Sequence, residues 1–143
     1  MKLQLVTLLG IQIDKEVYEI IIPTSTGEIA VYPGHEPLVT VIVPGAVMIR
    51  YNKVDSNAQL DYLAVSGGIA EISQHNVRIL VDAAINDEDI SEDESRVALE
   101  RSIELREKAA DQIELDEAHQ LVDRHFARLK VAELRRHHRG TLK

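Results

Sequence analysis

The chain has 143 residues, carries a formal net charge of −8 and contains no Cys, no Trp and a single Phe. This length allows one domain, or one domain with an appendage, and the absence of Cys excludes disulfides, zinc–thiolate sites and thiol nucleophiles. The negative charge and the scarcity of aromatic side chains argue against a nucleic-acid partner, and the lack of any apolar run of about 18 residues argues against insertion into a membrane.

Residues 1–86 show the pattern of short β-strands separated by turns. About eight apolar, β-branched segments follow one another at spacings of roughly ten residues, and no helical pattern separates them. The segments are residues 2–8, 17–22, 28–32, 38–43, 46–51, 60–66, 68–72 and 77–81. This arrangement predicts a mostly antiparallel β-sandwich or flattened barrel, because parallel strands need long crossover connections.

Glycines mark several of the connections between these segments. Pro33-Gly34 and Pro44-Gly45 suit the central positions of type II turns, because Pro presets φ and Gly accepts a positive φ. Gly67-Gly68 interrupts an apolar strand pattern, which predicts a bulge or the close approach of another backbone.

From Asp87 onward the pattern becomes helical, since residues 87–143 contain no Pro and one Gly. Ser91 and Glu94 fit a capping box, and we expect a break at residues 111–116 with Asp116 as the next N-cap. The expected apolar stripes are Leu99, Ile103, Ala110 and Ile113, interrupted by Arg106, and then Ala118, Leu121, Val122, His125, Leu129 and Ala132. Such narrow stripes predict an antiparallel helical hairpin, residues 87–143, that rests on the sandwich or on a partner.

Charge changes sign within this second unit. Residues 87–123 carry 14 acidic and 4 basic residues, whereas residues 124–143 carry 1 acidic and 7 basic residues. An antiparallel hairpin would bring the basic end of the second helix close to the acidic start of the first, where acids also complement the helix dipole. We therefore expect a folded hairpin to be electrostatically favoured and an acidic partner to compete for its basic end.

The chain lacks the motifs of the common enzyme classes. No phosphate-binding loop, dinucleotide fingerprint or nucleophile elbow is present, so we expect no enzymatic activity. His119 and Asp123 lie four residues apart but have no third ligand, so no metal site is predicted. Arg124 and Arg128 share a helical face, where they either grip a phosphate or carboxylate or form a solvated basic surface.

Four landmarks carry a resemblance to a known family. They are Gly27–Thr40, Pro44-Gly45 followed by Ile49-Arg50, Ser66–Ile72 continued by Asn76–Ala84, and Arg128–Leu134. With this order and spacing, the sequence resembles the epsilon subunit of bacterial F-type ATP synthases over nearly its full length. The resemblance implies an antiparallel β-sandwich followed by a helical hairpin, in a non-catalytic subunit of the rotating central stalk that couples proton-driven rotation to ATP synthesis.

The resemblance also implies partners and sites. The sandwich is expected to sit on the gamma subunit and the c-ring, with Glu28 and His35 at these contacts. The hairpin is expected either to fold onto the sandwich or to extend toward the catalytic alpha and beta subunits, where it blocks ATP hydrolysis. The residues assigned to this inhibitory tail are Arg124, Arg128, Lys130, Arg135 and Arg136. The expected location is the cytoplasmic face of the bacterial inner membrane, as a peripheral part of the complex.

Some members of this family bind a regulatory ATP at the hairpin, through an Ile/Leu-Asp-x-x-Arg-Ala motif and two arginines four residues apart. Arg124 and Arg128 match the second element, but the first departs from the motif, with Ser91 at the position of its Asp. Acidic neighbours would also repel phosphates, so we expect no cofactor. The alternative interpretation is a stand-alone ATP-sensing module with Asp93, Arg96, Arg124 and Arg128 as its contacts.

Overall fold

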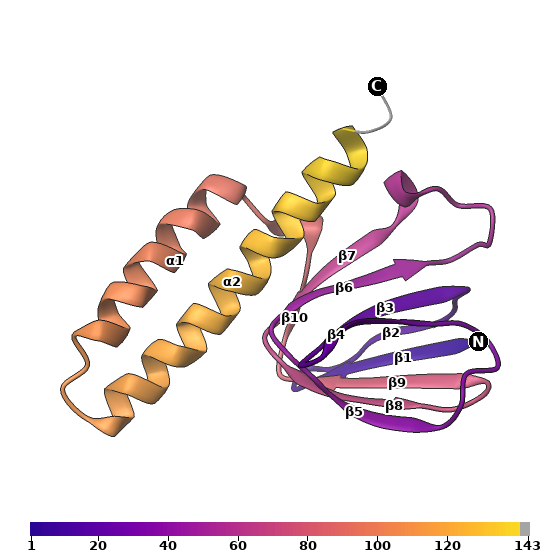
Figure 1. Cartoon of the computed structure of the whole chain (residues 1–143), viewed down its shortest axis with the longest axis horizontal. Helices are drawn as coiled ribbons and strands as arrows, with labels where there is room; N and C mark the ends of the chain where they lie inside the picture. The colour runs from indigo at the N-terminus through magenta and orange to yellow at the C-terminus, as the bar shows by residue number, and fades with distance from the viewer. Residues whose placement is uncertain (141–143) are drawn as a thin grey trace.

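The computed structural model describes residues 1–140, in which two five-stranded sheets lie face to face and two antiparallel helices follow (Figure 1). The strands are β1 (Lys2–Thr7), β2 (Gly10–Glu16), β3 (Glu19–Thr24), β4 (Gly27–Val31), β5 (Leu38–Ile42), β6 (Gly45–Arg50), β7 (Asp61–Val65), β8 (Gly68–Ile72), β9 (Asn76–Val81) and β10 (Ala84–Asn86). The helices are α1 (Glu92–Glu107) and α2 (Gln112–Gly140), and two short 3-10 turns are η1 (Asn57–Gln59) and η2 (Asp87–Asp89). The predicted α+β architecture is confirmed, and the end of the expected 87–143 unit lies outside the described residues.

Sheet 1 has the strand order β2-β1-β9-β8-β5, and sheet 2 has the order β10-β7-β6-β3-β4. Neighbouring strands are antiparallel except β1 and β9, which run parallel. The sequence predicted neither β2 nor β10. β2 is polar and exposed along most of its length and β10 has only three residues, so neither shows the apolar pattern of a buried strand. Both lie at sheet edges, where short or polar strands are tolerated.

The two central strands of sheet 2, β6 and β7, are buried on both faces. One face of these strands contributes to the sandwich core, and the other lies beneath α2. The residues beneath α2 are Ala46, Met48, Tyr62 and Ala64, and α2 covers them with Ala127, Val131 and Ala132. Burial on both faces explains the uninterrupted apolar runs of these strands, residues 46–49 and 62–65. Of the two supports expected for the hairpin, the structure therefore shows the sandwich (Figure 1).

The start of α1 was predicted well, but the start of α2 was not. The Ser91 hydroxyl accepts a hydrogen bond from the Glu94 amide at 3.4 Å, which confirms this half of the capping box. α2 begins at Gln112, and the cap lies five residues before the predicted Asp116, because the Asp111 carboxylate accepts from the Glu114 amide at 2.8 Å. Asp116 instead lies inside the helix and accepts from the Gln112 side chain at 2.7 Å.

The apolar stripes of the helices also differ from the prediction. Ile113, expected on the first stripe, is exposed at the start of α2, and Ala110 is exposed in the connection. α2 buries Ala127 and Val131, which the predicted single stripe omitted. The cause is that α2 has two neighbours, with α1 on one side and sheet 2 on the other, so it needs two apolar faces rather than one.

Three glycines test the turn predictions. Gly34 has φ of 90° and the His35 amide donates to the Tyr32 carbonyl at 3.2 Å, which confirms the type II turn there. The same prediction is wrong at Gly45, which has no positive φ; a Cβ there would lie 3.2 Å from the Cβ of Pro23, so close packing explains this glycine. The close approach predicted near Gly68 is confirmed, since a Cβ there would lie 2.2 Å from the Leu80 carbonyl oxygen.

Candidate functional site

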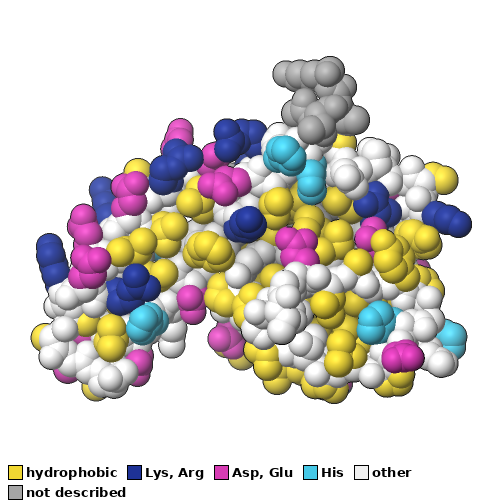
Figure 2. Space-filling model, viewed as in Figure 1, with side chains coloured by type: hydrophobic (Ala, Val, Ile, Leu, Met, Phe, Trp, Pro, Cys, Tyr) yellow, Lys and Arg dark blue, Asp and Glu magenta, His cyan; other side chains and the backbone are white. Residues whose placement is uncertain are grey.

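The outer face of sheet 1, which the hairpin does not cover, carries a continuous apolar row. The strand register joins one residue from each of the five strands across this face. In order across the sheet they are Val41, Ile69, Leu80, Val6 and Ile11. Val41 is 63% exposed and its neighbour Val39 is 70% exposed. Figure 2 shows hydrophobic side chains along the lower margin of the sandwich, where β5 and β8 lie.

The β1–β2 turn extends this row beyond the sheet. Leu8 and Leu9 are 83% and 92% exposed at its tip. The turn is held by Thr7, whose hydroxyl accepts from the Leu9 amide at 3.2 Å and donates to the Gly10 carbonyl at 3.4 Å. Two exposed leucines on an ordered turn, beside an exposed apolar row, are typical of a protein–protein contact surface. We call the row, Val39 and these two leucines the bare face.

The structure separates Glu28 and His35 instead of gathering them into one contact. Glu28 is exposed at the start of β4, where it pairs with Pro23 beside the β3–β4 turn. His35 is half-buried beyond the opposite end of β4, and its Nδ1 lies 2.6 Å from the Glu36 carbonyl oxygen. β4 therefore stands between them, a separation on the order of 15 Å along the strand direction.

The basic end of α2 folds back onto the acidic start of α1, as the charge pattern predicted. The Arg136 guanidinium lies 3.3 Å from the Glu92 carboxylate. The Arg135 guanidinium donates to the carbonyl oxygen of Asp87 and, at 3.5 Å, to that of Ile90. Two of the five residues assigned to the inhibitory tail are thus engaged within the chain, whereas Lys130, like Arg124, is exposed.

Arg124 and Arg128 line one cavity between α2 and the sandwich. The cavity has a volume of about 280 Å³, and Asp82 and Asp123 also line it. The Nε of Arg128 is buried, and among residues 1–138 it has no hydrogen-bond partner. Burial and, secondarily, the Arg124 charge lower the pKa of Arg128. His125 lies between the two arginines in the sequence. Burial is the largest cause of its lowered pKa, and the charges of Arg128 and Arg124 lower this pKa further.

The four residues of the implied ATP site do not come together. Arg96 is engaged on the exposed side of α1, at 3.1 Å from Glu92 and 3.2 Å from Asp93. The side of Arg128 that faces α1 borders a smaller cavity, about 170 Å³, which carboxylates also line. Its charged and polar lining residues are Asp89, Ser91, Glu94, Ser95, His125 and Arg128. The side chains near Arg128 are therefore mixed in charge, and the carboxylates among them would oppose the binding of a triphosphate.

In the described part of the chain, no group of three or more His, Asp or Glu side chains is arranged to hold a metal ion. No described helix combines the length and the apolar composition needed to cross a membrane.

Sequence reasoning missed a buried polar cluster at the end of the sandwich near Tyr32. Glu19 is only 6% exposed and accepts from the Tyr32 hydroxyl and from the Arg50 Nε, each at 2.7 Å. Burial alone raises the pKa of Glu19, but hydrogen bonds from Arg50 and Tyr32, with the Arg50 charge, outweigh it and hold this pKa below its usual range. The signal available in the sequence was a lone carboxylate within the apolar segment 17–22, directly before the three isoleucines of β3.

Comparisons with protein families and with solved structures all match this chain to ATP synthase proteins. The family model described as the ATP synthase delta/epsilon chain, β-sandwich domain, matches residues 1–87. A chain in a structure of the Euglena gracilis mitochondrial ATP synthase, containing OSCP, F1 and the c-ring, is 25% identical with a TM-score of 0.71, over 86% of this chain and 75% of that one.

A chain from the central stalk and c-ring of the Tetrahymena thermophila mitochondrial ATP synthase is 17% identical, with a TM-score of 0.51 over 62% of this chain and 68% of that one, and shares the fold. The family match covers the whole sandwich, which holds the larger part of the sequence. The chain belongs to the ATP synthase delta/epsilon family.

Proposed function

We propose that the chain is a non-catalytic subunit of the central stalk of an ATP synthase, which docks onto the rotor through its sandwich and restrains ATP hydrolysis through its hairpin. Family membership supports the first part, and so does the similarity to a chain of an ATP synthase assembly that contains F1 and the c-ring. The observation that carries the proposal is the bare face, which lies on the sheet opposite the hairpin. In a bacterium, a subunit with this role would lie at the cytoplasmic face of the inner membrane, as a peripheral part of the complex.

The bare face suits a permanent partner such as the gamma subunit. Its row of five residues is aliphatic, and in the next row across sheet 1 Val39 is followed by the polar residues Glu71, Arg78 and Gln4, which are neighbours in the strand register. An apolar centre with a polar margin is the usual anatomy of a stable interface. Glu28 and His35 lie at opposite ends of β4, so we assign them to two separate contacts, one with gamma and one with the c-ring.

The packing of the hairpin supports the proposal that it is an inhibitory element that can leave the sandwich. α2 packs on the sandwich, while α1 packs on α2. In the folded state Arg135 and Arg136 are engaged at the start of α1. Release of the hairpin would free both for an acidic surface of the catalytic alpha and beta subunits, together with Arg124, Arg128 and Lys130. Coupling of ion-driven rotation to ATP synthesis then depends on the sandwich, and inhibition depends on the hairpin.

Substitution on the bare face tests the docking. Val41→Asp places a carboxylate at the β5 end of the row, beside Val39, and we expect it to weaken co-purification with the gamma subunit by at least roughly tenfold, because an interface carboxylate must be desolvated. Val54→Asp is the matched control, since Val54 is 91% exposed in the β6–β7 loop and outside the bare face. Equal binding by both variants would place the docking surface elsewhere.

The ATP-sensing alternative has one supporting observation, the unpartnered Nε of Arg128 beside Arg124. Against it stand the carboxylates of Asp89 and Glu94 at the same arginine. We therefore propose the stalk function without a nucleotide cofactor.

A further inference from the structure

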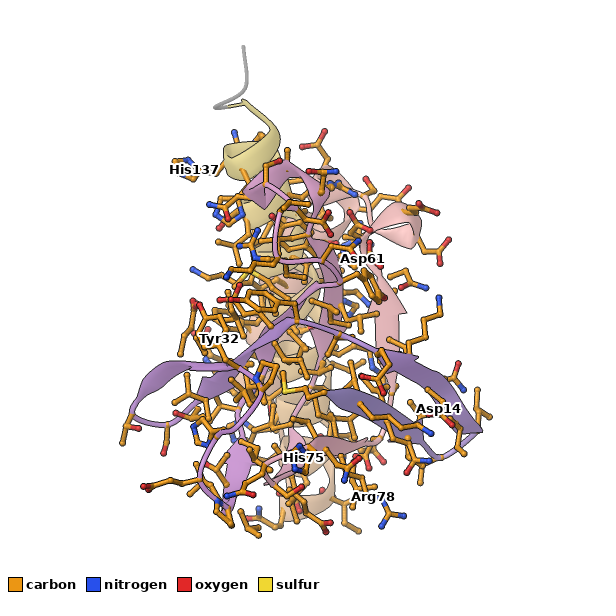
Figure 3. All side chains as sticks on the ribbon, turned by 90° about the vertical axis from the view of Figure 1, so that its right-hand side faces the viewer. Asp14, Tyr32, Asp61, His75, Arg78 and His137 are labelled. Carbon is orange, nitrogen blue, oxygen red and sulfur yellow. The ribbon has the colours of Figure 1, made fainter. Side chains whose placement is uncertain are left out.

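We infer that a hydrogen-bonded brace of Glu19, Arg50 and Asn57 couples the loop that carries His35 to the C-terminal end of α2, so that a partner bound at this loop changes how readily the hairpin opens. The inference rests on the proposed function, because it needs a hairpin that opens. Figure 3 looks onto this end of the sandwich, where Tyr32 lies between His75 below and His137 above.

The brace begins at the surface. Tyr32 is 44% exposed and is the first residue of the turn that positions His35. Its hydroxyl donates to one Glu19 oxygen, and Arg50 Nε donates to the other, each at 2.7 Å. Because the two donors occupy both oxygens of a buried carboxylate, a shift of Tyr32 moves the group that also orients Arg50.

Arg50 is also hydrogen-bonded to the β6–β7 loop, so a shift of its guanidinium would move that loop. One of its terminal nitrogens donates to the Asp55 carbonyl, and the other donates to the Asn57 side-chain oxygen at 2.8 Å. The loop is also closed on itself, since the Asp55 carboxylate accepts from the Asn52 amide at 2.9 Å. A single guanidinium therefore fixes the position of Asn57, at the start of η1, relative to Glu19.

Asn57 then acts on the hairpin through Tyr62. The Tyr62 hydroxyl donates to the Asn57 carbonyl at 3.4 Å and also contacts Nδ1 of His138, near the end of α2. A hydroxyl has one proton, so when Tyr62 donates it to Asn57 the oxygen is left to accept from His138, in the tautomer that carries a proton on Nδ1. A shift of the Asn57 carbonyl would therefore disturb the contact between Tyr62 and His138. The Tyr62 and His138 rings are also packed, with centroids 5.9 Å apart.

An ion pair is a costly way to stabilise this end of the sandwich, since a buried pair contributes little over apolar residues of similar volume. What the Glu19–Arg50 pair supplies is a fixed geometry between two loops. Through that geometry a shift at Tyr32 would reach the loop that contacts Tyr62.

Amide hydrogen exchange of the full chain tests the brace, read at residues 131–138 of α2. Tyr62→Phe removes one hydroxyl, and we expect it to raise local opening of α2 by roughly two- to tenfold, the usual range for one hydrogen bond. Tyr32→Phe, at the other end of the brace, is expected to raise the same opening by about twofold or more in the unmodified chain, and to have no effect when Tyr62 is already Phe. Asp14→Asn is the control, because it breaks the exposed Lys2–Asp14 ion pair, 3.3 Å long and outside the brace.

Three results would overturn the inference. The first is an exchange rate of α2 that does not change in Tyr32→Phe. The second is strict additivity of the effects that Tyr32→Phe and Tyr62→Phe have on this exchange rate. In both cases α2 still opens locally, so only the brace fails. The third is that, in the unmodified chain, the amides of α2 exchange at the same rate as those of β9. The hairpin would then open only with global unfolding, which would contradict the proposed function as well.

Discussion

The contact between α2 and sheet 2 can be weakened at one residue without touching the sandwich core. Val131 is fully buried between α2 and the sheet, in the cluster that includes Met48 and Tyr62. Val131→Ala removes two methyl groups, and the lost transfer energy together with a small cavity costs about 2 kcal/mol. That energy corresponds to a roughly 30-fold larger equilibrium constant for local opening of the hairpin.

The assay is amide hydrogen exchange, with α2 and the central strand β9 followed separately. Val65→Ala is the matched control, because Val65 is equally buried but points into the sandwich core from β7. Both variants lower the free energy of global unfolding, so exchange of β9 accelerates in both. Only Val131→Ala is expected to accelerate α2 through local opening.

Equal acceleration of α2 in both variants would refute this reasoning. It would show that hairpin and sandwich unfold as one cooperative unit, and a hairpin of that kind could not leave the sandwich while the sandwich stays folded.

Three further predictions concern charge and the tail. Burial raises the pKa of Glu19, but hydrogen bonds from Arg50 and Tyr32 outweigh it and hold this pKa low, so the stabilising contribution of the carboxylate is present above its unfolded pKa and is lost as pH falls through the lowered folded pKa. In urea unfolding, Glu19→Gln should therefore be less stable than the unmodified chain at pH 7, and the difference should shrink as the solution is acidified through the pKa of Glu19, whereas a pH-independent difference would contradict this. Removal of residues 124–143 should raise ATP hydrolysis by the assembled synthase and spare assembly, because docking uses the bare face; unchanged hydrolysis would argue against an inhibitory tail. Calorimetric titration with millimolar ATP should give no saturable heat, and saturable heat that disappears in Arg128→Ala would instead favour nucleotide sensing.

The strands and the hairpin followed from local patterns, and the errors came from neighbours that a local pattern does not contain. β2 was not predicted because it is an exposed edge strand, which is held by pairing with β1 and not by an apolar face. Gly45 was assigned to a turn because it follows Pro44, but its actual constraint is contact with Pro23, more than twenty positions earlier. Spacing alone did not reveal that β6 and β7 are covered on both sides.

The candidate sites divide in the same way. The charge reversal along the hairpin predicted that basic and acidic ends would meet, and Arg136 and Glu92 do so. The bare face was not predicted, because its row runs across five strands and appears only when their register is known. The Glu19 cluster was missed for a similar reason, since its partner Arg50 lies thirty-one positions away.

The two apolar clusters of the molecule differ in a way that explains which part is free to move. The sandwich core is built from branched aliphatic side chains such as Leu3, Ile20 and Ile79, which are fully buried. The hairpin contributes mainly small residues to its contact with sheet 2, namely Ala127, Val131 and Ala132. Small side chains let the helix lie close to the sheet but bury little apolar area, and the free energy of burial scales with that area. The sandwich therefore holds far more stabilisation than the hairpin contact, and an outside partner that supplies only a few kcal/mol could detach the hairpin while leaving the docking platform folded.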